Sequence, residues 1–361
     1  MIYPWYKPFV DNKKISNKLV SLAMTNNMTM GNEVVILENK LKKLLNVKYV
    51  VLTTSGTSAL LMAYIALECL KNKKILTTNL SWIASINPAL LTSCNIKLVD
   101  TYKNNQCVDF ELLFNEIKKF KPDILVLVHL NGDIYYNDKL NYYKKKYNFK
   151  IIEDAAQSFL TKDKKTYCGT KYEIGCFSLG ITKLINMVYG GFCATNSKVL
   201  YNRLYSIRNN GVNAIPENAK YELPTNVGLN LKPSNLHAAI GNLNLSNSKR
   251  ILTQVKKIYM TYKKMLNNEK IKIIDNYSLF AVPIYILVTV TNQKKFIGYC
   301  KRNGIILHFA LRTLDQSKLV KNKNKNCNSL FFSRNLIRLP CGPGYSIKKI
   351  IEICQLLNQY K

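Results

Sequence analysis

The chain has 361 residues, of which 47% are hydrophobic, enough for one large domain or two packed domains. Lysine and arginine outnumber aspartate and glutamate by 53 to 21, a formal charge of +32. No apolar run approaches the roughly 20 residues of a membrane span, and the N-terminus lacks a signal-peptide core. Three histidines, and ten cysteines in no CxxC pair, argue against a zinc site. We expect a soluble protein with reduced thiols in the cytoplasm.

Short β-rich runs alternate with helical patterns along the first 150 residues. Strands are expected at 48–54, 74–78, 96–99, 123–129 and 149–152, and helices at 58–70, 80–92, 109–120 and 138–147. This order predicts an α/β fold with a mostly parallel central sheet flanked by helices. In such a sheet, ligands bind beyond the carboxyl ends of the strands.

The C-terminal third has a different pattern. It predicts a long helix at about 236–266, a strand at 280–290, a helix near 293–303, an exposed loop at 321–328 and a last helix from 347. We expect the long helix to cross from a large domain, 1–245, into a smaller α+β domain, 246–361.

The first chemical signal follows the first expected strand. Gly56 permits a tight turn there, and Thr57 and Ser58 add hydroxyl groups where a helix begins. The free backbone N–H groups of a helix N-terminus form a site for an anion. The alternative is an ordinary helix cap without a ligand, because serine and threonine are good N-caps.

A second signal lies in the segment Ile151–Gln157, where a buried strand ends in two acids. Strand side chains alternate, so one of the two carboxylates must face the cleft, and Asp154 is the candidate. A buried carboxylate needs a cationic or hydrogen-bonding partner, and a protonated ring nitrogen would provide one. Gln157 adds an amide. The alternative for Asp154 is a helix N-cap.

The third signal is Lys183, the single cation in CFSLGITKLINMVYGGF, residues 176–192. Apolar surroundings disfavour the charged form of an amine and make it a nucleophile, as Schiff-base lysines require. The alternative is a surface lysine that snorkels, which the apolar residues Leu184, Ile185, Met187 and Val188 argue against. Ser178 offers a hydroxyl to the same anion as Thr57. Asn230, ahead of a helix expected to start at a proline, is a further phosphate candidate, although alone it reads as loop and cap.

In this order the segments resemble the DegT/DnrJ/EryC1/StrS family of sugar aminotransferases, which use pyridoxal 5'-phosphate (PLP) and have the aspartate-aminotransferase fold, fold type I. The resemblance runs from about Met30 to Pro340. The segments that carry it are Ser55–Leu60, Leu80–Ser85, Glu153–Gln157, Phe177-Ser178 with Lys183, and Gly228–Asn230.

The resemblance implies a role for each candidate residue. Lys183 would form the Schiff base and move protons between substrate and cofactor, and Asp154 would pair with the pyridine nitrogen. The family is dimeric with shared active sites, so a homodimer is implied. Trp82 would cover the ring face, and Gln157 would lie near the phenolic oxygen. The phosphate would be bound by Gly56, Thr57 and Ser178 of the same chain, and by Asn230 of the partner subunit.

The implied reaction transfers an amino group from L-glutamate to a keto group on a nucleotide-linked sugar. The expected position is C4 of a 4-keto-6-deoxyhexose, giving a viosamine- or perosamine-type product, with C3 as the alternative. The family also contains dehydratases in which a histidine replaces the lysine, so Lys183 favours transamination.

Four residues depart from the family pattern: Tyr189 stands for an acid, Lys232 for an arginine, and Asn131 and Asp133 for an aromatic residue and a glutamine. All four are expected to affect the sugar site, and His308 and Arg312 are further candidates for the nucleotide diphosphate. A PLP-binding regulator without catalysis stays open. So does a polyanion- or nucleic-acid-binding protein, although lysine diluted along the whole chain favours compositional bias over a nucleic-acid site.

Overall fold

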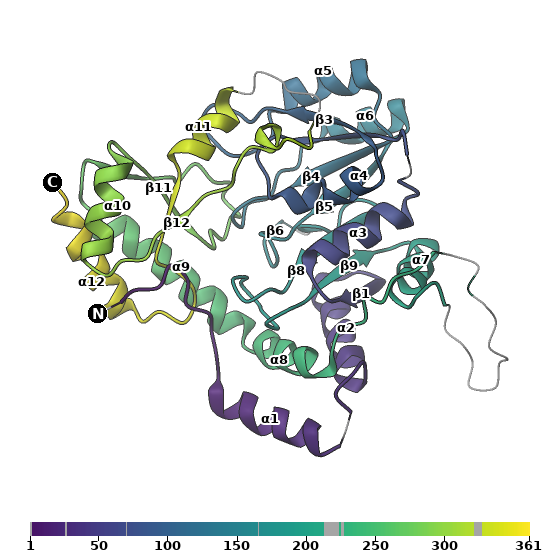
Figure 1. Ribbon diagram of the computed structural model, residues 1–361, viewed down its shortest axis with the longest axis horizontal. Coiled ribbons are helices and arrows are strands. Elements are labelled where there is room, and N and C mark those ends of the chain that lie inside the picture. The colour runs from purple at the N-terminus through teal and green to yellow at the C-terminus, as the bar shows by residue number, and fades with distance from the viewer. Residues whose placement is uncertain are drawn as a thin grey trace.

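The computed structural model describes residues 2–25, 27–69, 71–164, 166–212, 224, 227–320 and 327–361. Its centre is a seven-stranded sheet with helices on both sides (Figure 1). The strands, in spatial order, are β1 (Tyr49–Thr53), β9 (Gly191–Thr195), β8 (Ile174–Ser178), β5 (Lys150–Asp154), β4 (Ile124–Val128), β2 (Lys74–Thr78) and β3 (Asn95–Val99). Within this sheet β9 alone runs against its neighbours, so the prediction of a mostly parallel sheet is confirmed.

The described helices of this part of the chain precede, connect or follow the strands of the sheet. They are α1 (Asn12–Met24), α2 (Asn32–Leu45), α3 (Gly56–Ala66), α4 (Asn87–Leu91), α5 (Phe110–Phe120), α6 (Lys139–Tyr147) and α7 (Lys198–Arg208). All five residues of β4, Ile-Leu-Val-Leu-Val, are buried, as expected for a parallel strand covered on both faces. A small hairpin, β6 (Lys162–Asp163) and β7 (Thr166–Tyr167), lies apart from the main sheet.

Three of the expected helices have different bounds. The helix at 58–70 begins two residues earlier, at Gly56, and ends at Ala66. The helix at 80–92 is a 3-10 turn, η1 (Ile83–Ser85), followed by α4, because Pro88 has no N–H to continue a helix from the preceding turn and instead occupies the start of α4. The helix at 236–266 is broken at Asn247 into α8 (Asn235–Ser246) and α9 (Ser248–Met265).

A second, antiparallel sheet has the order β10 (Ile271–Ile273), β11 (Ile286–Val290), β13 (Ile337–Leu339) and β12 (His308–Phe309). The expected strand at 280–290 is therefore half wrong: it begins only at Ile286. Pro283 cannot donate to a ladder, and Val282 instead donates its N–H to the carbonyl of Gly132. Around this sheet lie α10 (Gln293–Arg302), η2 (Leu314–Gln316), α11 (Cys327–Asn335) and α12 (Ile347–Asn358).

Of the loop expected at 321–328, residues 321–326 lie outside the described residues, and Cys327 and Asn328 belong to α11. None of the described helices is long and apolar enough to cross a membrane. We keep the division into domains 1–245 and 246–361 as a proposal, supported by the two sheets, which fall one on each side of residue 245.

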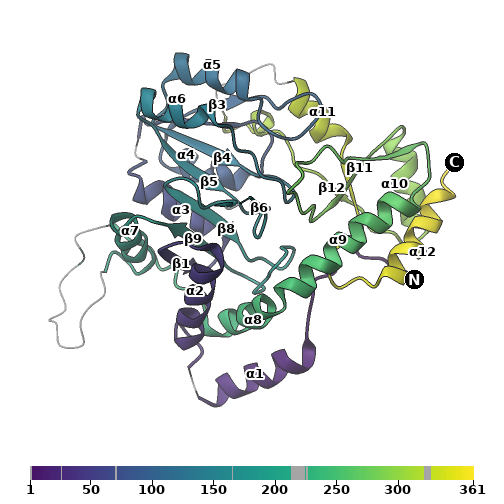
Figure 2. The same ribbon diagram turned by 180° about the vertical axis from the view of Figure 1, so that it is seen from behind.

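The N-terminal segment lies beside the C-terminal half of the chain. Tyr3 forms a bridge with Ile305, and Tyr6 forms one with Cys341. Figure 2 shows the N-terminus next to α12, at the far end of the line that α8 and α9 make across the molecule. These bridges bring Trp5 to the same side of the molecule as the functional site described below.

Candidate active site

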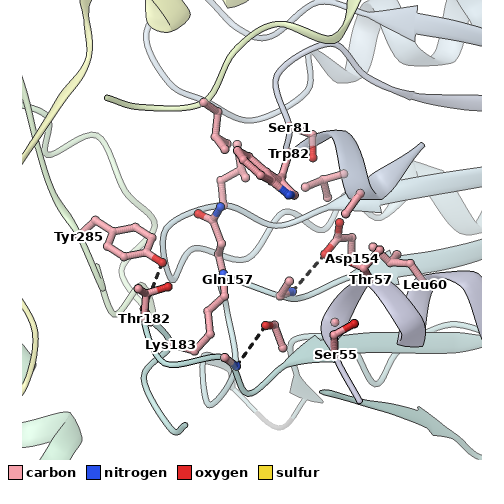
Figure 3. Close-up of a pocket in the computed structure, with 18 of the residues that line it drawn as sticks. Ser55, Thr57, Leu60, Ser81, Trp82, Asp154, Gln157, Thr182, Lys183 and Tyr285 are labelled. Carbon is pink, nitrogen blue, oxygen red and sulfur yellow. Dashed lines mark hydrogen bonds between the residues drawn. The ribbon is translucent and has the colours of Figure 1, made fainter. Parts of the chain in front are cut away.

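A cavity of about 320 Å³ lies beyond the carboxyl ends of β4, β5 and β8 (Figure 3). It is lined by seven of the eight residues singled out from the sequence: Gly56, Thr57, Trp82, Asp154, Gln157, Ser178 and Lys183. The eighth, Asn230, is exposed and does not line this cavity; it forms a bridge with Asn209. The topology of the sheet therefore brings together motifs that are more than 120 residues apart in sequence.

Asp154 ends β5 and turns its carboxylate into the cavity. Oδ2 accepts a 2.6 Å hydrogen bond from Ser85, and Oδ1 accepts one of 3.1 Å from the backbone N–H of Ala156. A turn, rather than an α-helix, follows the strand, so Asp154 does not cap a helix. Asp154 is 5% exposed, and these two donors hold its carboxylate in one orientation.

The neighbouring acid, Glu153, points the other way, as strand alternation requires. It is fully buried and accepts hydrogen bonds from Tyr136 and from three backbone N–H groups of residues 169–172. Nε2 of His129 lies 3.4 Å from its Oε2. Burial raises the pKa of Glu153, but the contacts with His129, Tyr136 and the backbone outweigh burial and hold the pKa below its usual value. Glu153 thus secures the back of the strand that presents Asp154.

The N-terminus of α3 forms another wall. Ser55 is the N-cap, and its Oγ accepts from the N–H of Ser58. Gly56 is already helical, so the tight turn expected there is wrong. A Cβ on Gly56 would lie 2.8 Å from Cβ of Ser178, so glycine is required by the close approach of β8. The first N–H groups of α3 and the hydroxyls of Thr57 and Ser178 therefore converge on one wall of the cavity.

Lys183 comes from the loop between β8 and β9. Its N–H donates to the carbonyl of Gly180, and its carbonyl accepts from the hydroxyl of Tyr6. The side chain is half-buried, lines the cavity and forms no ion pair with any described residue. It is therefore not a snorkelling surface lysine, because its amine is available inside the cavity.

Two further predicted residues complete the walls. Oε1 of Gln157 accepts a 3.1 Å hydrogen bond from the N–H of Asn131, which fixes the amide at the cavity. Trp82 precedes η1 and is 63% exposed at the cavity edge, a position from which an indole ring can cover one face of a flat ligand.

The residues that depart from the family pattern divide into two groups. Tyr189 lines the cavity, and it follows Val188, whose φ of +69° is strained for a β-branched residue. Asn131, Asp133 and Lys232 do not line this cavity. Asn131 instead bonds to Tyr285 and Tyr277, and Asp133 accepts from Ser278, so both join the loop after β4 to residues 277–285.

Three cavity residues that matter below were not singled out from the sequence: Trp5, Tyr285 and Arg338. Ser85, which also was not singled out, does not line the cavity but donates to Asp154. His308 lines the cavity as one of the two further candidates, whereas Arg312 is exposed and does not. One signal for Arg338 was available, because it is a lone cation in the apolar run Leu336–Leu339. Nothing local in the sequence places Trp5, which reaches the cavity only through the bridges of the N-terminal segment.

Comparison with known proteins shows the family of the chain. Residues 10–358 match the model of the DegT/DnrJ/EryC1/StrS aminotransferase family. GDP-perosamine synthase of Escherichia coli O157:H7 is 25% identical over 99% of this chain and 98% of its own. UDP-4-amino-4,6-dideoxy-N-acetyl-beta-L-altrosamine transaminase of Campylobacter jejuni is 30% identical over 51% of this chain and 49% of its own.

Solved structures share the fold over nearly the whole chain. The Helicobacter pylori aminotransferase PseC, involved in pseudoaminic acid biosynthesis, superposes with a TM-score of 0.90 at 18% identity, covering 99% of this chain and 98% of its own. A mutant of the GDP-4-keto-6-deoxymannose-3-dehydratase ColD, with bound GDP-perosamine, gives 0.87 at 19% identity and covers 98% and 100%. The predicted fold type I is confirmed, and the chain belongs to the DegT/DnrJ/EryC1/StrS aminotransferase family.

Proposed function

We propose that this protein is a PLP-dependent aminotransferase that moves an amino group from L-glutamate to C4 of a nucleotide-linked 4-keto-6-deoxyhexose. One observation carries the proposal: the amine of Lys183, without an ion-pair partner among the described residues, and the fixed carboxylate of Asp154 face the same cavity. The family membership supports transamination, and the full-length similarity to GDP-perosamine synthase supports C4.

The residues of the cavity fit PLP. Its volume of about 320 Å³ lies at the lower end of the range for small-ligand pockets. The wall made by the α3 N-terminus, Thr57 and Ser178 suits a phosphate group. Asp154 suits a protonated pyridine nitrogen, and Trp82 and Gln157 suit the ring face and the phenolic oxygen. A structure of a related dehydratase contains hydrated PLP.

PLP, when bound, supplies an electron sink for a carbanion at the substrate carbon. Asp154, held by Ser85 and Ala156, keeps the proton on the pyridine nitrogen, and the helix N-terminus holds the phosphate. The amine of Lys183 would hold PLP at its carbonyl carbon. The same amine would act as the general acid–base that takes the proton from the substrate carbon and returns one.

We further propose a homodimer in which Asn230 of the partner subunit completes the phosphate site. Exposure of Asn230 outside the cavity of its own chain supports this assignment. A cytoplasmic location is proposed from the ten cysteines, which form no disulfide within the described part of the chain.

Borohydride reduction tests the cofactor assignment. The purified protein, reduced in the presence of PLP and digested, should carry a pyridoxyl group on Lys183 and on no other lysine. Absence of the adduct would refute the proposal. A panel of nucleotide-linked 3-keto and 4-keto sugars with L-glutamate then tests the reaction, and NMR of the product distinguishes C4 from C3. An adduct without turnover on any sugar would indicate a PLP-binding regulator.

A further inference from the structure

Arg338 is a buried cation at the cavity. It lies in β13, paired with His308 of β12 on one side and with Leu287 of β11 on the other. Its side chain is 8% exposed. The guanidinium carbon lies 4.3 Å from the ring centre of Tyr285 and 5.9 Å from that of Trp5. These contacts hold the planar group in place, with the cavity on its open side.

This guanidinium has no anionic partner among the described residues. It forms no ion pair with any of them, and its Nε is buried without a hydrogen-bond acceptor. A buried charge without compensation is costly, and because this guanidinium also faces the cavity, an anionic ligand there would compensate it. Asp154 is the single carboxylate among the described residues that line the cavity, and it forms no ion pair with Arg338; its proposed partner is the pyridine nitrogen of PLP.

The other groups near Arg338 also suit an oxyanion. His308 stacks against Trp5 with ring centres 4.4 Å apart, and its Nδ1 lies 2.7 Å from the carbonyl of Phe309, which fixes the orientation of the ring. Trp5, Tyr285, His308 and Arg338 come from four separate segments, joined by the bridges of the N-terminal segment and by the second sheet. Together they form a rigid wall of the cavity, in which the guanidinium of Arg338 faces the cavity without an anionic partner among the described residues.

We propose that Arg338 binds a carboxylate of the amino-acid donor, an inference that rests on the proposed transamination. The donor must bring its amine to the position of Lys183 while its carboxylates remain in the same cavity. Among the described lining residues, Lys183 and Arg338 are the lysine and arginine side chains. Lys183 has the proposed catalytic role, so Arg338 is the cation that remains for a carboxylate. The planar fork of a guanidinium matches a carboxylate through two parallel hydrogen bonds. The diphosphate of the sugar nucleotide is the other source of an oxyanion, and the experiment separates the two.

The two half-reactions can be measured independently. Conversion of the PLP enzyme by L-glutamate alone, followed by absorbance, reports the donor. Consumption of the keto-sugar by the aminated enzyme reports the acceptor. Arg338→Gln should lower kcat/KM for L-glutamate roughly 10- to 100-fold and leave the acceptor half-reaction within about twofold. Arg338→Lys keeps the charge but loses the planar fork. Its kcat/KM for L-glutamate should lie between that of wild type and that of Arg338→Gln. Arg334→Gln removes an exposed arginine of α11 and should change neither.

Binding to the PLP enzyme gives a second readout that does not depend on turnover. Glutarate, which lacks the amine, should bind the wild-type protein in calorimetry and lose roughly 10-fold or more in affinity with Arg338→Gln. Uridine diphosphate should bind both equally. A loss confined to uridine diphosphate and to the acceptor half-reaction would overturn the inference in favour of phosphate. Unchanged glutarate binding and unchanged donor kinetics would also overturn it. If wild-type protein reacts with no amino acid, the proposed function fails instead.

Arg338→Gln leaves a smaller polar group in a strand, so its fold must be checked. Circular dichroism and the thermal midpoint of the variant are compared with those of wild type. If Arg338→Gln does not fold, the lysine variant decides: a donor-specific loss supports the inference, and wild-type donor kinetics overturns it.

Discussion

Ser85 donates a 2.6 Å hydrogen bond to Oδ2 of Asp154 although the two residues are 69 positions apart in the chain. Ser85 is fully buried at the end of η1, and its own Oγ lies 2.6 Å from Oγ of Ser81. The short turn that replaces the expected helix at 80–92 is thus what brings Ser85 to the carboxylate. The same turn carries Trp82 to the cavity edge, so one element sets both the ring face and the ring-nitrogen partner of the proposed PLP site.

Replacing Ser85 with alanine should weaken this arrangement. A hydrogen bond to a charged group contributes about 1.5–3 kcal/mol, so Ser85→Ala should lower PLP affinity roughly 10- to 100-fold, measured by fluorescence titration of the apoenzyme. Asp154→Asn should affect turnover more strongly, because it removes the charge itself. Ser197→Ala removes a serine N-cap from α7, away from the cavity. It should reduce stability by about 1 kcal/mol and leave PLP affinity unchanged; equal PLP losses in both serine variants would contradict the role of Ser85.

A methyl group at Gly56 should disturb the wall that the α3 N-terminus, Thr57 and Ser178 offer to the phosphate. The added Cβ would lie 2.8 Å from Cβ of Ser178, so the α3 N-terminus or the end of β8 must shift. We expect Gly56→Ala to reduce PLP affinity by about 10-fold or more, with a smaller change in the thermal midpoint. At Gly180 the added Cβ would meet nothing closer than Oγ of Ser178, at 3.6 Å. Gly180→Ala should therefore reduce PLP affinity less than Gly56→Ala does. A larger loss of PLP affinity in Gly180→Ala would refute the steric argument.

The sequence motifs predicted the part of the site that local chemistry defines. Gly56, Asp154, Ser178 and Lys183 each stand at or just after the end of a strand, and the parallel sheet brings strand ends to one edge. The reason given for Gly56 was wrong, because a close approach between two elements depends on the packed structure and not on the local sequence. Asn131 was expected to affect the sugar site because it departs from the family pattern, whereas its amide binds Tyr277 and Tyr285, 146 and 154 positions away.

The rest of the cavity depends on long-range pairing. Arg338 meets His308 and Tyr285 through the second sheet, and Trp5 joins them through bridges to Ile305 and Cys341. The strand expected at 280–290 ran through Pro283, whereas β11 begins at Ile286 and the residues before it form the loop that presents Tyr285 to the cavity. Such contacts leave no periodic signal in a single sequence, because each residue belongs to a segment whose own pattern is satisfied without the others.

Lys183→Ala should abolish transamination and leave the fold intact. The side chain forms no ion pair with a described residue, while the backbone bonds to Gly180 and Tyr6 do not need the amine. We expect turnover to fall below detection, and the thermal midpoint to stay within about 2 °C of wild type. Lys162→Ala, at an exposed position of β6, should retain full activity. Turnover by the Lys183 variant would disprove the catalytic assignment.

The buried network behind Asp154 predicts a dependence of stability on pH. Nδ1 of His129 accepts from the N–H of Tyr135, so the ring proton sits on Nε2 and faces Glu153. Because the folded-state pKa of Glu153 is lowered, its contribution to the free energy of unfolding is fully present above the unfolded pKa of about 4.3. That contribution is lost as the pH falls from there through the lower folded-state pKa. In urea unfolding of the wild-type protein, the free energy of unfolding should therefore begin to decline at about pH 4 as the pH is lowered.

Glu153→Gln isolates this contribution. The amide cannot accept from all of the donors that surround the carboxylate, so the variant should lose about 1–3 kcal/mol at neutral pH. Its stability should then fall less steeply than that of wild type below about pH 4, so that the two curves converge. Glu68→Gln breaks the exposed pair with Arg203 and should cost less than about 1 kcal/mol, with the wild-type pH profile. Parallel curves for wild type and Glu153→Gln would show that Glu153 does not titrate in this window.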